Sequence, residues 1–265
     1  MKINKINIGG GFPLVLIAGP CVIENYERTY KIACILKTIT KELGIPFIFK
    51  ASYDKANRTS IHSFRGPGID EGLRILSEIK TKLNIPILSD IHKIDEIEKA
   101  AEVLDILQVP AFLCRQTDLV VEIARTNKPI NIKKGQFLAP WDMVNVVEKI
   151  KTTGNYKLLL TERGTMFGYN NLVVDFRSIK IMQDIGFPVI FDATHSVQLP
   201  GEAGNSSGGQ REFVSILARA AVAIGVNGLF LEVHEDPNDA LCDGPNSLDL
   251  PNLFLLLKGI KKINA

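Results

Sequence analysis

The chain is poor in cysteine, in net charge and in long apolar runs, and each shortage excludes a class of protein. Four cysteines in 265 residues form no CxxC pair, which argues against a disulfide framework and for free thiols in a reducing cytoplasm. A net charge of +2 is too small to attract nucleic acid or an anionic membrane, so we expect neither as a partner. The chain has no run of about 18 apolar residues and no signal-peptide core, so we expect no membrane span.

The chain has enough apolar side chains for one large hydrophobic core. Hydrophobic residues make up 46% of the 265 residues, which suits one domain over residues 1–265 better than two small ones. Residues 1–12 alternate charged and apolar side chains. This alternation predicts a short N-terminal β-hairpin that covers one end of the domain.

Short apolar, β-branched runs alternate with segments of helical spacing along the chain. Helices are expected at 30–43, 70–83 and 211–224, among others, because their apolar residues recur about every 3.6 positions. Turn residues such as Gly44 and Pro46 separate a helix from the strand that follows it. Eight strands are expected, at residues 14–18, 47–50, 87–90, 106–109, 130–133, 158–161, 189–192 and 229–232.

Strands that are apolar nearly throughout, each followed by a helix, indicate a parallel sheet covered by helices. Eight such units in roughly 250 residues are typical of a (β/α)8 TIM barrel. An open doubly wound sheet is the alternative, but its first strand normally leads into a glycine-rich phosphate turn. Here the first strand leads into Ala18-Gly-Pro-Cys21 instead. We therefore expect an α/β fold, a TIM barrel with a short N-terminal β-hairpin.

Polar or reactive residues follow every expected strand. In a TIM barrel the active site lies at the C-terminal ends of the strands, so these residues should share one rim. A solvated basic loop would explain the lysines near residue 50, but not a polar residue after all eight strands. The residues are Cys21, Lys50, Lys55, Asp90, His92, Gln108, Lys133, Gln136, Arg163, His195, Glu232 and His234.

Positive charge is concentrated after three of the strands. Lysine supplies a point charge and arginine a planar fork, so together they suit a small ligand with phosphate and carboxylate groups. The residues of this group are Lys50, Lys55, Lys133 and Arg163.

A second group offers donors for a borderline divalent metal. Thiolate, imidazole and carboxylate donors suit Zn, Fe or Mn. For the histidine the alternative is a core side chain with a satisfied hydrogen bond, and for the cysteine it is a small buried apolar residue. The residues are Cys21, His195, Glu232 and Asp243.

Seven motifs, in order along nearly the whole chain, point to one enzyme family. They are AGPC at 18–21, FKASYDKANRTSIHSFRGPG at 49–68, PAFLCRQTDL at 110–119, NIKKGQFLAPWD at 131–142, TERGTMFGYNNLVVDFRS at 161–178, DATHSVQLPG at 192–201 and CDGPNSL at 242–248. On these motifs the chain resembles the 3-deoxy-D-manno-octulosonate 8-phosphate synthases. Those enzymes are transferases that condense phosphoenolpyruvate with arabinose 5-phosphate for lipopolysaccharide synthesis.

The resemblance implies roles for the residues of the rim. The catalytic residues it implies are Lys50, Lys55, Asp90 and His195. The phosphoenolpyruvate ligands it implies are Lys50, Lys55, Gln108, Lys133 and Arg163, with the last two at the phosphate. The sugar phosphate ligands it implies are Asn57, Arg58, Thr59, Gln136 and Arg115, the last from a neighbouring subunit. Thr59 stands where the family usually has serine, and its hydroxyl should preserve the contact.

The resemblance also implies a metal and an assembly. The family has a metal-dependent form with cysteine after the first strand and a metal-independent form with asparagine there. Cys21 therefore favours a divalent Zn, Fe(II), Mn or Co ion, held with His195, Glu232 and Asp243, although the CDGP sequence at 242–245 is more typical of the metal-independent form. We expect no organic cofactor, only small-molecule substrates, and a homo-oligomer that is a tetramer by analogy.

Three other functions compete with this interpretation. A synthase that uses erythrose 4-phosphate, making 3-deoxy-D-arabino-heptulosonate 7-phosphate, would carry Lys-Pro-Arg-Thr where this chain has Lys55-Ala-Asn-Arg58. A Schiff-base aldolase would need a lysine in apolar surroundings, whereas Lys50 and Lys55 stand among polar residues. A non-catalytic sugar-phosphate sensor would be expected to have lost some of the reactive rim residues.

Overall fold

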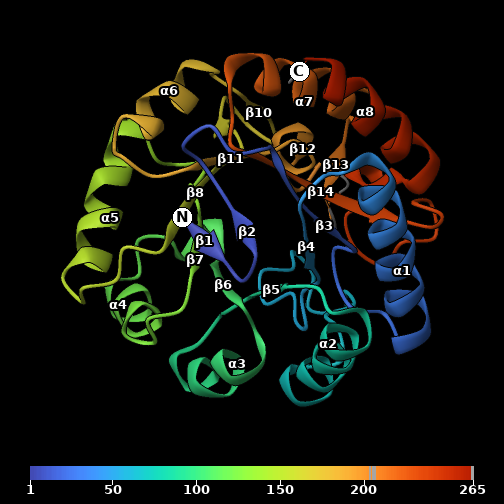
Figure 1. Cartoon of the computed structure of the whole chain (residues 1–265), viewed down its shortest axis with the longest axis horizontal. Helices are drawn as coiled ribbons and strands as arrows, with labels where there is room; N and C mark the ends of the chain where they lie inside the picture. The colour runs from blue at the N-terminus through green and yellow to red at the C-terminus, as the bar shows by residue number, and fades with distance from the viewer. Residues whose placement is uncertain (203, 205–206, 264–265) are drawn as a thin grey trace.

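A closed barrel of eight parallel strands, ringed by eight α-helices, makes up the fold of the computed structural model, which describes residues 1–202, 204 and 207–263 (Figure 1). Each strand pairs with its neighbours in chain order, and pairing of the seventh with the eighth and of the eighth with the first closes the ring. The predicted TIM barrel is therefore confirmed. The strands are β3 (Val15–Gly19), β4 (Phe47–Lys50), β5 (Ile87–Asp90), β6 (Ile106–Val109), β7 (Ile130–Lys133), β8 (Leu158–Glu162), β11 (Val189–Asp192) and β14 (Gly228–His234).

One helix follows each barrel strand and packs its apolar face on the outside of the barrel. The layer between strands and helices holds the larger part of the buried apolar side chains. The helices are α1 (Tyr26–Leu43), α2 (Ile69–Leu83), α3 (Ile97–Val103), α4 (Thr117–Arg125), α5 (Met143–Lys151), α6 (Arg177–Gln183), α7 (Val214–Ile224) and α8 (Leu250–Ile263). No helix within the described ranges is both long and apolar enough to cross a membrane.

Several predicted boundaries are wrong by a few residues. Strand β3 lies one residue later than expected, β8 extends one residue further, and β14 is longer at both ends. Helix α1 begins at Tyr26 because the side chain of Asn25 accepts a hydrogen bond from the Arg28 amide and caps the helix. The helix expected at 211–224 begins with a 3-10 turn, so α7 itself starts at Val214.

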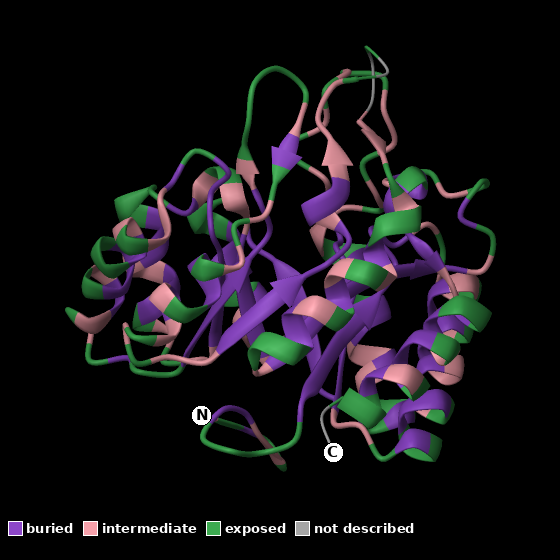
Figure 2. Ribbon diagram, turned by 90° about the horizontal axis from the view of Figure 1, so that it is seen from above, coloured by how far each residue is buried: buried purple, intermediate pink, exposed green. Residues whose placement is uncertain are grey.

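The N-terminal hairpin covers the bottom of the barrel, as the alternating sequence predicts. Strands β1 (Lys2–Ile3) and β2 (Ile6–Asn7) pair antiparallel and cross the barrel axis at its N-terminal end (Figure 1; Figure 2, lower edge). Ile3 and Ile8 are buried and belong to an apolar cluster with inward side chains of the strands, such as Val15 and Ile48. The lower half of the barrel is thus a filled core and not a channel.

Short elements of the loops rise above the opposite end of the barrel (Figure 2). They were not predicted, because two-residue strands leave no periodic pattern. The strands are β9 (Thr165–Met166), β10 (Leu172–Val173), β12 (Gln198–Leu199), β13 (Gly208–Gly209) and β15 (Leu248–Asp249). The 3-10 turns are η1 (Ile94–Glu96), η2 (Ala111–Leu113), η3 (Pro140–Asp142), η4 (His195–Val197), η5 (Arg211–Phe213) and η6 (Gly244–Asn246).

Gly19 shows how the packing of the strands sets the position of the rim. A Cβ atom at Gly19 would lie 1.8 Å from the backbone oxygen of Lys50. Glycine therefore allows the end of β3 to approach the end of β4, where Lys50 begins the polar rim.

Candidate active site

Two adjoining cavities open at the C-terminal end of the barrel, and nearly all predicted site residues line one or both of them. The inner cavity is bordered by strand ends and includes Lys50, Lys55, Asn57, Asp90, His92, Gln108, Lys133, Arg163, His195, Phe230 and Glu232. The outer cavity is bordered by loops and includes Lys55, Asn57, Arg58, Thr59, Gln136, Arg163, His195, Gln198, Cys242 and Asp243. The two cavities share several residues, so ligands in them would lie next to each other.

Three residues singled out from the sequence line neither cavity. Cys21 is buried behind Asp243, with its Sγ 3.2 Å from Asp243 Oδ2. Arg115 is exposed and lines neither cavity of its own chain. His234 is the last residue of β14, and its Nε2 lies 3.3 Å from Glu24 Oε1. The strand is longer than predicted, and its last residue lies against Glu24, just before α1, and not at the shared rim. Grouping His234 with the rim residues was therefore wrong.

Lys50 and Lys55 share one carboxylate. Lys50 Nζ lies 2.7 Å from Glu232 Oε1 and also donates to the backbone oxygen of Cys21 at 2.8 Å. Lys55 Nζ lies 3.9 Å from the same Glu232 oxygen. Burial favours the neutral amine of Lys55, but the acidic groups of Cys21 and Glu232 outweigh it and raise the pKa of Lys55 well above its ordinary value. Lys55 is therefore a fixed cation in the inner cavity.

Lys133 and Arg163 occupy the opposite side of the inner cavity. Lys133 pairs with the buried carboxylate of Asp192, and its Nζ lies 3.3 Å from the centre of the Phe230 ring. Burial lowers the pKa of Lys133, and Asp192 only partly offsets this effect. Arg163 Nη2 donates to Gln198 Oε1 at 3.0 Å, while its Nη1 is buried without a hydrogen-bond partner in the described structure. A buried guanidinium N–H without a partner indicates a place for an anionic oxygen.

A chain of polar side chains crosses the barrel interior and fixes two of the predicted residues. Thr161 donates to Asn131 at 2.6 Å, Asn131 donates to Gln108 at 2.7 Å, and Gln108 donates to Asp90 at 2.5 Å. Burial would raise the pKa of Asp90, but Lys55 and Lys50 hold it well below its usual range. Gln108 therefore faces a permanent carboxylate. Asn131 and Thr161 were missed, although each is a polar residue within a fully buried strand.

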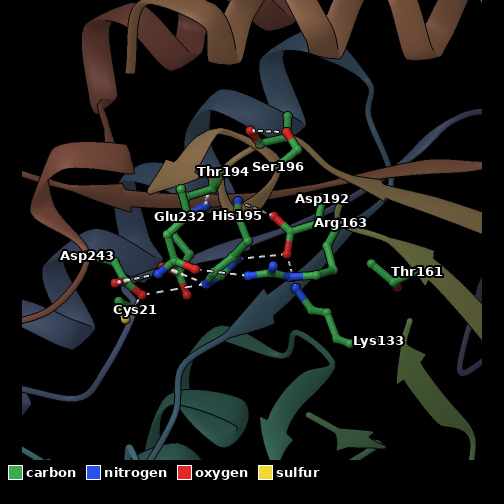
Figure 3. A network of polar contacts seen from close by, with 12 residues as sticks. Cys21, Lys133, Thr161, Arg163, Asp192, Thr194, His195, Ser196, Glu232 and Asp243 are labelled. Atoms are coloured by element: carbon green, nitrogen blue, oxygen red, sulfur yellow. Dashed lines mark hydrogen bonds and ion pairs between the residues drawn. The ribbon is translucent and has the colours of Figure 1, made fainter. Parts of the chain in front are cut away.

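The carboxylate of Asp192 sets the orientation of His195 (Figure 3). Asp192 Oδ2 lies 2.7 Å from His195 Nδ1, and Asp192 Oδ1 accepts from the His195 amide at 2.9 Å. The other ring nitrogen, Nε2, then lies 3.6 Å from both Glu232 Oε2 and Asp243 Oδ2. Glu232 Oε2 is buried and has no hydrogen-bond partner within the described residues. A carboxylate that supports a histidine from behind is a common arrangement in metal centres.

Asp243 connects the histidine to a pair of sulfurs. Its Oδ2 lies 3.2 Å from Cys21 Sγ, and Cys21 Sγ lies 2.8 Å from Cys242 Sγ. The potential metal donors thus form two overlapping groups that share Asp243, one with both cysteines and one with His195 and Glu232. The four predicted ligands meet through Asp243, and the buried, unpartnered oxygen of Glu232 fits a cation. Cys242 was missed as a donor, although its place beside Asp243 could have identified it.

Gln198 links the anion side of the site to the metal donors, and it was also missed. Its Oε1 accepts from Arg163 at 3.0 Å, and its Nε2 donates to Asp243 Oδ1 at 3.3 Å. The only signal in the sequence was its place three residues after His195 in the DATHSVQLPG motif.

Known proteins resemble the chain over its whole length. The DAHP synthetase I family matches residues 1–264. A protein of Geobacter sulfurreducens is 66% identical over 265 residues, which is 100% of this chain and 97% of the relative. A protein of Desulfosudis oleivorans is 66% identical over 262 residues, covering 98% and 94%, and one of Trichlorobacter lovleyi is 64% identical over 265 residues, covering 100% and 97%. All three are named 2-dehydro-3-deoxyphosphooctonate aldolase.

That name is a synonym of the synthase family that the seven motifs resemble, so the resemblance is confirmed. Because a family match over nearly the whole chain agrees with full-length relatives of high identity, this chain belongs to the DAHP synthetase I family.

Proposed function

We propose that the protein condenses phosphoenolpyruvate with D-arabinose 5-phosphate and water, giving 3-deoxy-D-manno-octulosonate 8-phosphate and inorganic phosphate. The observation that carries the proposal is the junction of two cationic cavities at one rim, in a chain 66% identical to proteins named for this product. The reaction is a step of lipopolysaccharide synthesis. Action as a single domain over residues 1–265, in the cytoplasm, belongs to the same proposal.

Phosphoenolpyruvate binds in the inner cavity. Arg163 and Lys133 hold its phosphate, which is consistent with the unpartnered Nη1 of Arg163. Lys50 and Lys55 lie across the cavity beside Glu232 and neutralise the carboxylate of the substrate. Gln108, held by Asn131 and Asp90, lines the space between these cations.

The sugar phosphate binds in the outer cavity, nearer to solvent. Asn57, Arg58 and Thr59 lie on the loop after β4 and line this cavity together with Gln136. Arg115 lines neither of these two cavities among the described residues, and it is assigned to the outer cavity of a neighbouring subunit. This role accords with a homo-oligomer, taken as a tetramer by analogy with the family.

The chemistry requires one carbon–carbon bond and one carbon–oxygen bond to form. C3 of phosphoenolpyruvate attacks the sugar aldehyde, water adds to C2, and the resulting hemiketal phosphate breaks its C2–O bond to release inorganic phosphate. The surrounding cations stabilise negative charge as it moves between carboxylate, phosphate and C2. Lys50, Lys55, Asp90 and His195 surround the place where the substrates meet, and holding both substrates there supplies further acceleration.

A divalent metal at this centre would be held by Cys21, His195, Glu232 and Asp243. When bound, it would supply a Lewis acid beside the aldehyde and the attacking water. The thiolate donor favours Zn, Fe(II), Mn or Co over Mg, which prefers an all-oxygen shell. Asp192 prepares His195 for this role by holding its Nδ1.

The experiment that tests the proposal measures phosphate release from phosphoenolpyruvate with arabinose 5-phosphate, with erythrose 4-phosphate, and with neither. Arabinose 5-phosphate should support release at least about tenfold better in kcat/KM, because this chain has Lys55-Ala-Asn-Arg58 where the shorter-sugar enzymes have Lys-Pro-Arg-Thr. Chelation should abolish release, and added Mn or Zn should restore it. Equal rates with the two sugars, or no release with either, would refute the proposal.

One observation favours a second candidate, a Schiff-base aldolase. Lys133 is buried against Phe230, and burial lowers the pKa of Lys133, as such a mechanism requires. Its ion pair with Asp192, however, favours the protonated ammonium over the neutral amine that a Schiff base needs. Borohydride trapping with a 2-keto acid discriminates between the two, because a covalent adduct on Lys133 would favour the aldolase.

A further inference from the structure

A second cysteine, Cys242, lies next to the proposed metal ligand Cys21. Cys21 follows β3 and Cys242 lies in the loop after β14, yet their sulfurs are 2.8 Å apart and both residues are only 4% exposed. Cys21 Sγ also lies 3.2 Å from Asp243 Oδ2. Two sulfurs and a carboxylate oxygen that converge in a buried place form a donor set for a thiophilic ion.

The loop that carries Cys242 is anchored on both sides. Glu24 Oε1 accepts a hydrogen bond from the Leu241 amide at 3.0 Å, just before the cysteine. Arg211 Nη2 donates to the Gly244 backbone oxygen at 2.6 Å, just after Asp243. These two hydrogen bonds fix the loop on both sides of Cys242, so they also fix the position of its sulfur beside Cys21.

A cation contacts the second sulfur from the side of the outer cavity. Arg58 Nη1 donates to Cys242 Sγ at 2.8 Å. A guanidinium in this place compensates negative charge on the sulfur in the same way that second-layer groups stabilise metal-bound ligands. The same arginine is assigned to the sugar phosphate above, so Cys242 lies between the metal donors and the outer cavity.

We propose that Cys242 is a fifth protein donor of the metal centre, and that it gives the site a preference for thiophilic ions such as Zn and Cd over Mn. The proposal rests on the metal requirement in the proposed function. Both thiols lose a proton to solvent when they bind the ion. Two sulfurs at about 2.3 Å from one ion stand further apart than the 2.8 Å seen here, so the pair opens when the ion binds. A harder ion such as Mn is held mainly by His195, Glu232 and Asp243.

The direct test counts thiolates on Co(II) in the metal-stripped, full-length protein, without substrates. Thiolate-to-Co(II) absorption in the near ultraviolet grows with the number of bound sulfurs, so Cys242→Ser should roughly halve the band, as should Cys21→Ser. Cys34→Ser is the matched control, because Cys34 lies on α1, away from both cavities, and should leave the band unchanged. A non-thiol reductant and exclusion of air keep the two thiols from joining in a disulfide.

A full band in Cys242→Ser, or no thiolate band in the unmodified protein, overturns the proposal. Metal affinities provide a second test that does not depend on the Co(II) spectrum. Competition with a chelator should show that Cys242→Ser weakens Zn binding by about tenfold or more and Mn binding by less than about twofold. Equal weakening for both ions also overturns the proposal, and circular dichroism verifies that the variant is folded.

Failure of this proposal is distinguishable from failure of the proposed function. If the protein releases phosphate with arabinose 5-phosphate but Cys242→Ser leaves the thiolate-to-Co(II) band unchanged, only the role of Cys242 as a fifth donor is refuted. A two-sulfur band in a protein that releases no phosphate refutes only the condensation.

Discussion

At the scale of single residues, the two phosphate-binding candidates are not equivalent. Lys133 already has a carboxylate partner in Asp192, whereas Arg163 has one buried N–H group without any partner among the described residues. An incoming phosphate would complete the hydrogen bonding of Arg163, but it would have to share Lys133 with Asp192. The arginine should therefore contribute the larger part of the binding energy.

Arg163→Ala and Lys133→Ala should each raise the apparent KM for phosphoenolpyruvate more than that for the sugar. We expect about 30- to 100-fold for Arg163→Ala, since hydrogen bonds to charged groups contribute about 1.5–3 kcal/mol each, and a smaller effect for Lys133→Ala. Steady-state kinetics with each substrate varied in turn measures both values. Lys258→Ala, at an exposed lysine of α8 outside both cavities, is the control. A larger effect on the sugar would reverse the assignment of the two cavities.

The identities of the rim residues were predictable, but their contacts were not. Lys50, Asp90 and Lys133 end parallel strands, and a closed barrel places all such ends at one edge. Gln198 and Cys242 lie on long loops, where the position of a side chain depends on distant anchors and not on a repeating pattern. Their roles therefore became visible only with the geometry.

At the scale of elements, the loop after β4 depends on one buried contact. Tyr53 is fully buried, and its hydroxyl donates to Glu96 Oε2 at 2.9 Å, an oxygen that also accepts from the His92 amide at 3.1 Å. A Cβ atom at Gly72 would lie 2.3 Å from Tyr53 Cβ, so the first turn of α2 packs directly on the base of the Tyr53 side chain. These contacts hold the loop that bears Lys55 and the residues proposed to bind the sugar phosphate.

Glu96→Gln should make the protein less sensitive to acid as well as less stable at neutral pH. Burial would raise the pKa of Glu96, but hydrogen bonds from His92 and Tyr53 lower it from 4.5 to about 2. The stabilisation is therefore full above pH 4.5 and is lost as the pH falls towards 2. We expect a loss of roughly 1–2 kcal/mol at pH 7, allowing for solvent screening, and little difference between the proteins near pH 2.

Urea unfolding at several pH values measures the free energy of unfolding of the two proteins. Glu98→Gln is a suitable control, because Glu98 is an exposed residue of the neighbouring helix α3. Parallel curves of stability against pH for Glu96→Gln and the unmodified protein would show that Glu96 does not have this role.

At the scale of the whole molecule, the barrel is closed at one end by its own N-terminus. Ile8 is fully buried and packs with Ile3 against side chains such as Val15 and Ile17 inside the barrel. Phe230 belongs to this apolar cluster and also lines the inner cavity, so it separates the filled lower half from the site. The (β/α)8 pattern could be predicted because it repeats eight times, and the hairpin because its apolar residues alternate.

Ile8→Ala should destabilise the fold by about 2–4 kcal/mol while leaving the site intact, because it opens a cavity at the end opposite to the rim. Thermal or urea unfolding measures the loss, and kcat at 25 °C should stay within about twofold of the unmodified value. Ile216→Ala, at an isoleucine of α7 that is 59% exposed, should cost much less. An unchanged free energy of unfolding for Ile8→Ala would mean that the hairpin is not needed to complete the core.

Because the barrel is filled below Phe230, the inner cavity is closed on the side of the N-terminal hairpin. A ligand therefore reaches the inner cavity from the loop side of the barrel, where the outer cavity lies. A sugar phosphate bound first in the outer cavity would hinder the entry of phosphoenolpyruvate into the inner cavity. We therefore expect phosphoenolpyruvate, which is proposed for the inner cavity, to bind before the sugar phosphate, and the ligand released in the inner cavity to leave last.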